Sequence, residues 1–115
     1  MPRLTRPLAL PRRADFLRAA RVGRRVASPG MVVQLLERGD DAPPRLGITA
    51  TKKLGNAVAR NRVRRRLREA ARLVLGAAPC SGLDLVLIGR EATRQRDFAT
   101  LCAELRRALD RAGRP

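Results

Sequence analysis

The 115-residue chain contains no histidine, which removes the commonest general base, proton shuttle and zinc ligand from its chemistry. Its two cysteines, Cys80 and Cys102, have no neighbours that complete a metal-ligand pattern. Among the acids, Asp15 and Asp84 are isolated, and Asp97 is better explained as a helix cap. A metal-dependent nuclease built on these three acids is therefore a weak hypothesis. We expect neither a catalytic residue nor a metal ligand in the protein itself.

Long hydrophobic runs are also missing. No segment approaches the roughly 20 apolar residues that span a bilayer, and the N-terminal segment lacks the apolar stretch of a signal peptide. We therefore expect a cytoplasmic protein that has no membrane partner. A hydrophobic content of 44% is nevertheless ordinary for a folded protein, and 115 residues suit one domain.

Acidic residues are scarce relative to basic ones. Lysine and arginine number 26 against 10 acids, a net charge of +16, and a compact domain with that charge repels itself unless a polyanion neutralises it. Nucleic acid is the leading partner, a membrane surface the second and an acidic protein the third. Only Lys52 and Lys53 are lysines, and arginine suits phosphate because its planar guanidinium pairs with two oxygens at once. Codon bias in a GC-rich genome accounts for most of the preference for arginine, but not for the net charge.

Hydrophobic periodicity and turn residues predict the order helix, three strands, helix, strand, helix. We expect residues 1–12, with three prolines, to form a flexible basic arm, residues 13–112 a single RNA-binding domain and residues 113–115 a tail. The expected helices cover residues 13–22, 57–75 after an Asn56 cap, and the segment after Asp97. The expected strands cover residues 24–27, 31–36, 45–51 and 83–88.

This order predicts an α+β domain with a mixed four-stranded sheet covered by helices. The strand, helix and strand within residues 45–88 should form a parallel pair joined by a crossover. General statistics make such a crossover right-handed.

Positive charge is concentrated in residues 52–72, KKLGNAVARNRVRRRLREAAR, where nine cations and one acid give +8, half of the net charge. At about 100° per residue, one stripe of the predicted helix is apolar: Val63, Leu67, Ala70, Ala71 and Val74. The opposite side gathers Asn61, Arg64, Arg65, Arg68 and Arg72. Like charges at these spacings destabilise a helix, and a merely solvated face would interleave acids with bases. The pattern therefore predicts a polyanion lying along this helix.

The start of the same helix is a second place for phosphate. Arg60 lies near the edge of the apolar stripe, in the first turn, where it can reach past the helix start together with Lys52 and Lys53. Free amides after Asn56 add the positive end of the helix dipole. The turn Lys-Lys-Leu-Gly alone is weak support, because it lacks the spacing of a nucleotide-binding loop.

The segment KKLGNAVARNRVRRRLRE resembles the signature of the bacterial ribonuclease P protein family, K-K-x-G-N-A-V-x-R-N-R followed by a basic helix ending near R-E. The resemblance extends over roughly residues 10–112. It implies the order αβββαβα in a two-layer domain like domain 2 of ribosomal protein S5, with an unusual left-handed crossover. It also implies that the protein binds ribonuclease P RNA and precursor tRNA, assists removal of the 5′ leader and broadens the substrate range. The RNA would perform the chemistry and bind most of the Mg²⁺.

The resemblance also implies two sets of site residues. The surface for the catalytic RNA comprises Lys52, Lys53, Arg60, Asn61, Arg62, Arg64, Arg65 and Arg68. The cleft for the leader comprises Phe16, Gln34 and Arg90. The family often has aromatic residues where this chain has Ala20 and Gln34, and Tyr and Trp are absent, so stacking would depend on Phe16 and on arginines. Ordinary core packing is the other interpretation of Phe16.

Two further functions compete with this one. A ribosomal assembly protein could bind RNA through the same helix, and composition alone does not separate it from a ribonuclease P subunit. A DNA-binding helix-turn-helix is weaker, because the basic helix follows a strand and no short partner helix precedes it. We therefore expect no DNA partner.

Overall fold

The computed structural model describes residues 8–76 and 81–111. Its helices and strands follow one another as β1 (Leu8–Ala9), α1 (Arg13–Val22), β2 (Arg24–Ser28), β3 (Met31–Glu37), β4 (Arg45–Thr49), α2 (Ala57–Gly76), β5 (Leu83–Gly89) and α3 (Phe98–Arg111). Short 3-10 turns lie at Lys52–Leu54 (η1) and Glu91–Arg94 (η2). The predicted order of helices and strands is confirmed, with one strand added at the front. No helix of the described part is long and apolar enough to cross a membrane.

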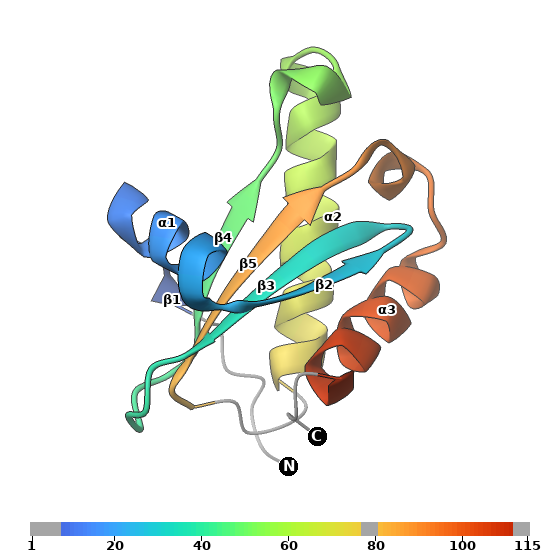
Figure 1. The fold of residues 1–115 in the computed structure, drawn as a ribbon. Helices are drawn as coiled ribbons and strands as arrows, with labels where there is room; N and C mark the ends of the chain where they lie inside the picture. Colours follow the sequence, from blue (N-terminus) through green and yellow to red (C-terminus); the bar gives the residue numbers. More distant parts are fainter. Residues whose placement is uncertain (1–7, 77–80, 112–115) are drawn as a thin grey trace.

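The sheet has five strands in the order β1-β4-β5-β3-β2 (Figure 1). β5 pairs in parallel with β4 and antiparallel with β3, so the sheet is mixed. In Figure 1, β4 and β5 both point upward, β5 lies to the right of β4, and α2 passes behind the sheet between them. That arrangement makes the crossover left-handed, as the family resemblance implied and against the general statistical preference.

The fifth strand corrects the prediction of a four-stranded sheet and of a flexible arm reaching to residue 12. Leu8 and Ala9 pair with the first two residues of β4, and the Leu10 amide donates to the carbonyl of Leu46 at 3.0 Å. Leu10 is only 8% exposed, because it packs beside Phe16 on the sheet. The prolines of this segment argue against a strand, and its pairing partner lies more than 30 residues away, so no local pattern predicts it. Residues 1–7 and 113–115, predicted as arm and tail, lie outside the described residues, as does Cys80.

The core has two parts, one on each face of the sheet. Alternate residues of β5 divide between them, with Leu85 and Leu87 facing α2 and α3, and Val86 and Ile88 facing α1. The predicted apolar stripe of α2 is buried (Val63, Leu67, Ala70, Ala71 and Val74), and all of these except Ala70 belong to the larger part of the core. Each large side chain buried in this way contributes about 1.5–3 kcal/mol. The burial also fixes which side of α2 remains free.

Both predicted helix caps are confirmed. The Asn56 Oδ1 accepts a hydrogen bond from the amide of Ala59 at 3.0 Å, which begins α2. The Asp97 Oδ2 accepts from the amide of Thr100 at 3.1 Å and begins α3. Asp97 therefore has a structural role, as the sequence indicated. Cys102, predicted to be buried on α3, is partly buried against the core.

Candidate nucleic-acid interface

The free side of α2 carries the cations that the sequence analysis predicted. Burial of the apolar stripe turns Asn61, Arg62, Arg65 and Arg68 to solvent, while Arg60 and Arg64 are half-buried. Lys52 and Lys53 are exposed on η1, immediately before the helix. The eight predicted residues therefore share one helix and the turn leading into it, and that turn and the start of the helix project beyond the sheet (Figure 1). We call these eight residues the α2 surface.

The charge of the α2 surface is uncompensated. None of its seven cations forms an ion pair within residues 8–76 and 81–111. The Arg64 guanidinium donates to the Asn61 Oδ1 at 3.2 Å, which aligns two members of the surface without neutralising either. Cations held this close repel one another until phosphate or another anion approaches.

Two other arginines of α2, Arg66 and Arg72, contact groups within the protein. Arg72 lies against Glu69, and its Nε donates to the Glu69 Oε1 at 3.2 Å; this hydrogen bond raises the pKa of Arg72. Arg66 is half-buried and donates to the backbone carbonyl of Arg96, in the segment that leads to α3. At about 100° per residue Arg66 lies next to the cationic face, but the tertiary contact shows that it holds α2 against the neighbouring segment.

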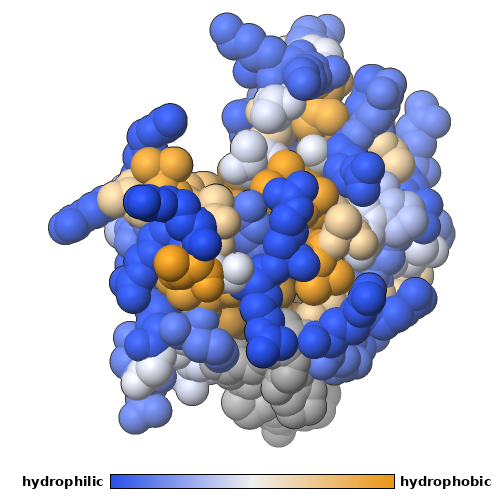
Figure 2. All heavy atoms as spheres, viewed as in Figure 1, coloured by the Kyte–Doolittle hydropathy of each residue, from blue (hydrophilic) through white to orange (hydrophobic). Residues whose placement is uncertain are grey.

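A groove of about 540 Å³ adjoins the α2 surface where β1 and the part of β4 beyond it separate α1 from α2. One side of this groove is apolar and includes Phe16, while the other carries Arg64, Arg68 and the Arg72–Glu69 ion pair. The Phe16 ring lies directly over Gly47, since a Cβ on that glycine would be 2.5 Å from the ring carbon Cε2. Figure 2, which views the face of the sheet covered by α1, shows hydrophobic residues gathered there among hydrophilic ones. We call this the β4 groove.

The position of Phe16 is compatible with both interpretations of this residue. The ring packs against the smaller part of the core, and it also lines the β4 groove. Gly47 and Ile48, which form part of the same lining, were not among the predicted site residues. A glycine between Leu46 and Ile48 in a predicted strand was an available signal, because such a glycine often marks a close approach.

The other two leader-cleft candidates are placed differently. Gln34 lies in the same row of the sheet as Gly47, with Val86 between them, but its side chain is only 7% exposed. Arg90 follows β5, and its guanidinium donates to the carbonyl of Ser28 at 2.9 Å. Four residues of strand separate the row of Val86 from Arg90, about 13 Å at the usual rise. Neither Gln34 nor Arg90 lines the β4 groove.

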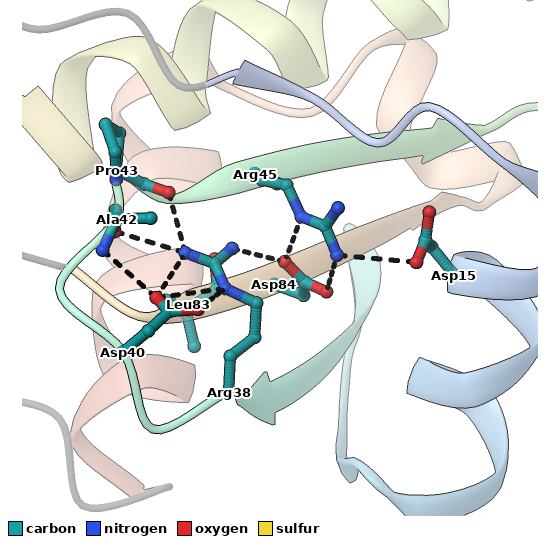
Figure 3. Close-up of polar contacts among 8 residues, drawn as sticks. All are labelled: Asp15, Arg38, Asp40, Ala42, Pro43, Arg45, Leu83 and Asp84. Carbon is teal, nitrogen blue, oxygen red and sulfur yellow. Dashed lines mark hydrogen bonds and ion pairs between the residues drawn. The ribbon is translucent and has the colours of Figure 1, made fainter.

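A buried polar network holds α1 beside this groove (Figure 3). The Asp84 carboxylate accepts from Arg45 Nε at 2.7 Å and Nη2 at 2.6 Å, and from Arg38 Nη1 at 2.6 Å. Burial on its own raises the pKa of Asp84, but the hydrogen bonds from the two arginines outweigh it and hold that pKa below its usual value. Arg45 also reaches the Asp15 carboxylate of α1 at 3.4 Å. The network thus joins the helix that carries Phe16 to β4 and β5.

Asp15 and Asp84, the acids considered as metal ligands, are therefore held in ion pairs. Within the described residues, no group of three or more His, Cys, Asp or Glu side chains is arranged to hold a metal ion. The arrangement of the site is suited to binding a polyanion through hydrogen bonds and charge.

Comparison with known proteins gives a consistent set of relatives. The Ribonuclease P family model matches residues 4–113. The ribonuclease P protein component of Gluconacetobacter diazotrophicus is 59% identical over 104 residues, which cover 90% of each chain. That of Paramagnetospirillum magneticum is 46% identical over 108 residues, 90% of this chain and 81% of the relative. The solved structure of the RNase P protein from Thermotoga maritima superposes with a TM-score of 0.75 at 34% identity, covering 90% of this chain and 96% of that one.

Proposed function

Because the chain belongs to the ribonuclease P protein family, we propose that its α2 surface binds the catalytic RNA of that enzyme. Membership fixes the coarse role: the chain is the protein component of bacterial ribonuclease P, a ribonucleoprotein endoribonuclease of tRNA processing, and its partner is ribonuclease P RNA. The family sets aside the alternative of a ribosomal assembly protein.

The observation that supports this placement is the uncompensated charge of the α2 surface. Five of the seven cations lie on a helix that the core holds in one position and two lie on the turn before it, and none of the seven forms an ion pair with an acid of the described part. A fixed row of guanidinium groups binds phosphate at little entropic cost, because the helix has already been ordered by packing. Arg60, Asn61 and Arg62 lie in the first turns, beside Lys52 and Lys53, where the helix dipole adds to their charge.

We further propose that the 5′ leader of precursor tRNA enters the β4 groove. An aromatic ring on one side and arginines on the other suit an unpaired nucleotide, whose base stacks while its phosphate meets a guanidinium. Gln34 and Arg90 lie outside the groove lining, so they would meet only a leader that continues along the sheet. Contact with the leader adds binding energy that does not depend on the tRNA body, which would let the holoenzyme accept a broader range of precursors.

Hydrolysis itself is assigned to the RNA and to Mg²⁺ bound mainly by it. The part of the protein is to neutralise phosphates where the RNA and the precursor come together, so that both can be held at low concentrations of free magnesium. We propose that this takes place in the cytoplasm, where precursor tRNA is made.

Reconstitution tests the proposed function directly. The protein is added to a bacterial ribonuclease P RNA at low magnesium, and removal of the leader is measured for the wild type and for Arg60→Ala and Arg62→Ala. Both variants should bind the RNA more weakly and retain the wild-type melting temperature, with Arg18→Ala, an exposed arginine of α1, as the matched control. Each lost phosphate contact should reduce the slope of log Kd against log salt by about 0.7–0.9. Unchanged affinity and slope in both variants would show that RNA does not lie on the α2 surface.

A further inference from the structure

A second basic surface lies at the opposite edge of the sheet, and the proposed function does not use it. β2 is the last strand in the sheet, so its outer edge pairs with no other strand of the described residues. A groove of about 460 Å³ follows this edge and is lined by Arg24, Arg25, Val26, Ala27 and Arg111. We call the three arginines of this lining, with the strand edge between them, the β2-edge surface.

Its arginines approach the edge from both faces of the sheet. Arg24 is paired with Leu35, a residue of the core beneath α2 and α3, so it lies on the face of α3. Arg25 is paired with Gln34 and lies on the face of α1. Arg111 comes from the last turn of α3, which packs on β2. The three side chains therefore surround one strip of exposed backbone.

The charge of this strip is also uncompensated. None of its three arginines forms an ion pair within the part of the chain that is described. Arg107, exposed one helical turn before Arg111, adds a fourth cation on the same side of α3. The exposed acid Asp110 lies about 100° from Arg111 around the helix, although it is three residues after Arg107 and so neighbours that cation.

The backbone adds donors of its own. Along the free edge of an antiparallel strand, the amides of alternate residues point outward with no partner. Guanidinium and amide groups together are the donors that contact phosphate oxygens in nucleic-acid complexes, independently of base sequence. An extended phosphodiester chain suits a strip of this kind better than a single compact anion does.

We propose that the β2-edge surface binds a second segment of RNA backbone, distinct from the segment on the α2 surface. Three strand spacings separate β2 from β4, about 14 Å, and the arginines of α2 lie beyond β4, beside the β4 groove. One domain thus presents cations at two opposite edges and holds two backbones apart at a fixed distance. The inference rests on the proposed function only in taking RNA as the partner.

The first test compares two triple variants of the full-length protein for affinity to ribonuclease P RNA across a range of potassium chloride. Arg24→Ala/Arg25→Ala/Arg111→Ala removes the β2-edge surface. The control Arg13→Ala/Arg18→Ala/Arg106→Ala removes the same charge from exposed arginines that line neither groove. The β2-edge variant should lower the slope of log Kd against log salt by about 2, at 0.7–0.9 per phosphate, and the control should leave it nearly unchanged.

A second test locates the RNA. A photo-crosslinking residue at Ala27, an exposed residue of the strip, should capture a segment of ribonuclease P RNA other than the one captured from Val58, exposed near the start of α2. Equal slopes for the two triple variants, or an Ala27 probe that captures no RNA, would overturn the inference. Equal slopes together with self-association of the β2-edge variant would show that the arginines keep the edge of β2 from pairing with another copy of the chain. Loss of binding only in an Arg64→Ala/Arg65→Ala/Arg68→Ala variant would refute this inference and leave the proposed function standing.

Discussion

Replacing Asp84 with asparagine tests how the polar network of Figure 3 holds the fold together. The Asp84 side chain is 2% exposed and accepts three hydrogen bonds of 2.6–2.7 Å from Arg38 and Arg45. Asparagine has the same shape but no charge, and its amide hydrogens face other donors. Removing one partner of a buried ion pair costs about 3–5 kcal/mol, because the remaining charge is left without compensation.

Both arginines keep other partners, which reduces the expected cost. Arg38 still donates to the carbonyls of Ala42 and Pro43, and Arg45, with 24% of its side chain exposed, still reaches Asp15 and water. We therefore expect Asp84→Asn to lower the free energy of unfolding by about 2 kcal/mol at neutral pH. With a urea slope of about 1.5 kcal/mol per molar, the midpoint of unfolding should fall by about 1.3 M.

The same substitution has a predictable dependence on pH. The folded-state pKa of Asp84 is lowered, so its contribution to stability is fully present above the unfolded value of about 3.9 and is lost as the pH falls through the folded value. The difference between wild type and Asp84→Asn should therefore shrink between pH 5 and pH 2. Urea unfolding followed by circular dichroism measures it, with the exposed Asp40→Asn as a control expected to have a small effect. A difference below about 0.5 kcal/mol at neutral pH, or one that stays constant down to pH 2, would refute the reasoning.

Four other substitutions separate binding from folding. Arg66→Ala should lower the free energy of unfolding by about 1–2 kcal/mol and leave the salt dependence of RNA binding unchanged. Arg65→Ala, at an exposed position, should instead lower the slope of log Kd against log salt by about 0.7–0.9 at constant stability. The opposite result would show that Arg65 stabilises the fold and Arg66 binds RNA. Gly47→Ala should displace the Phe16 ring and lower the free energy of unfolding by about 1–3 kcal/mol. It should weaken binding of precursor tRNA with a leader but not of mature tRNA, and equal losses of affinity for both substrates would count against a leader site. Leu10→Ala should lower the free energy of unfolding by about 2 kcal/mol, because Leu10 is buried. An unchanged free energy of unfolding would show that the segment of β1 and Leu10 is a detached arm.

The two faces of α2 could be predicted because burial and charge follow the helical period. Every residue of the predicted apolar stripe is buried, and the opposite side carries the cations. Arg66 could not be distinguished from Arg65 in the same way. Its partner is a backbone carbonyl in the segment before α3, 30 residues along the chain, and no local pattern encodes that contact.

β1 and the handedness of the crossover could not be predicted from local sequence patterns either. Two residues among prolines have no strand period, and the pairing arises only because β4 offers a free edge. The handedness of the crossover contradicts the general preference, so only the family signature could indicate it. The β4 groove shows the same limit, since Gly47 and Phe16 meet across 31 positions of sequence.

The distribution of acids explains why so much positive charge stays exposed. The two buried acids each hold arginines within the fold: Asp84 pairs with Arg38 and Arg45, and Glu104 with Arg96. Glu104 also accepts from the Gly30 amide at 2.8 Å, which ties the β2–β3 turn to α3. Acids placed in this way increase the stability of the fold without neutralising either basic edge of the sheet. The repulsion left on the surface is then relieved only by an external polyanion, so the same division of charge that stabilises the domain favours its association with RNA.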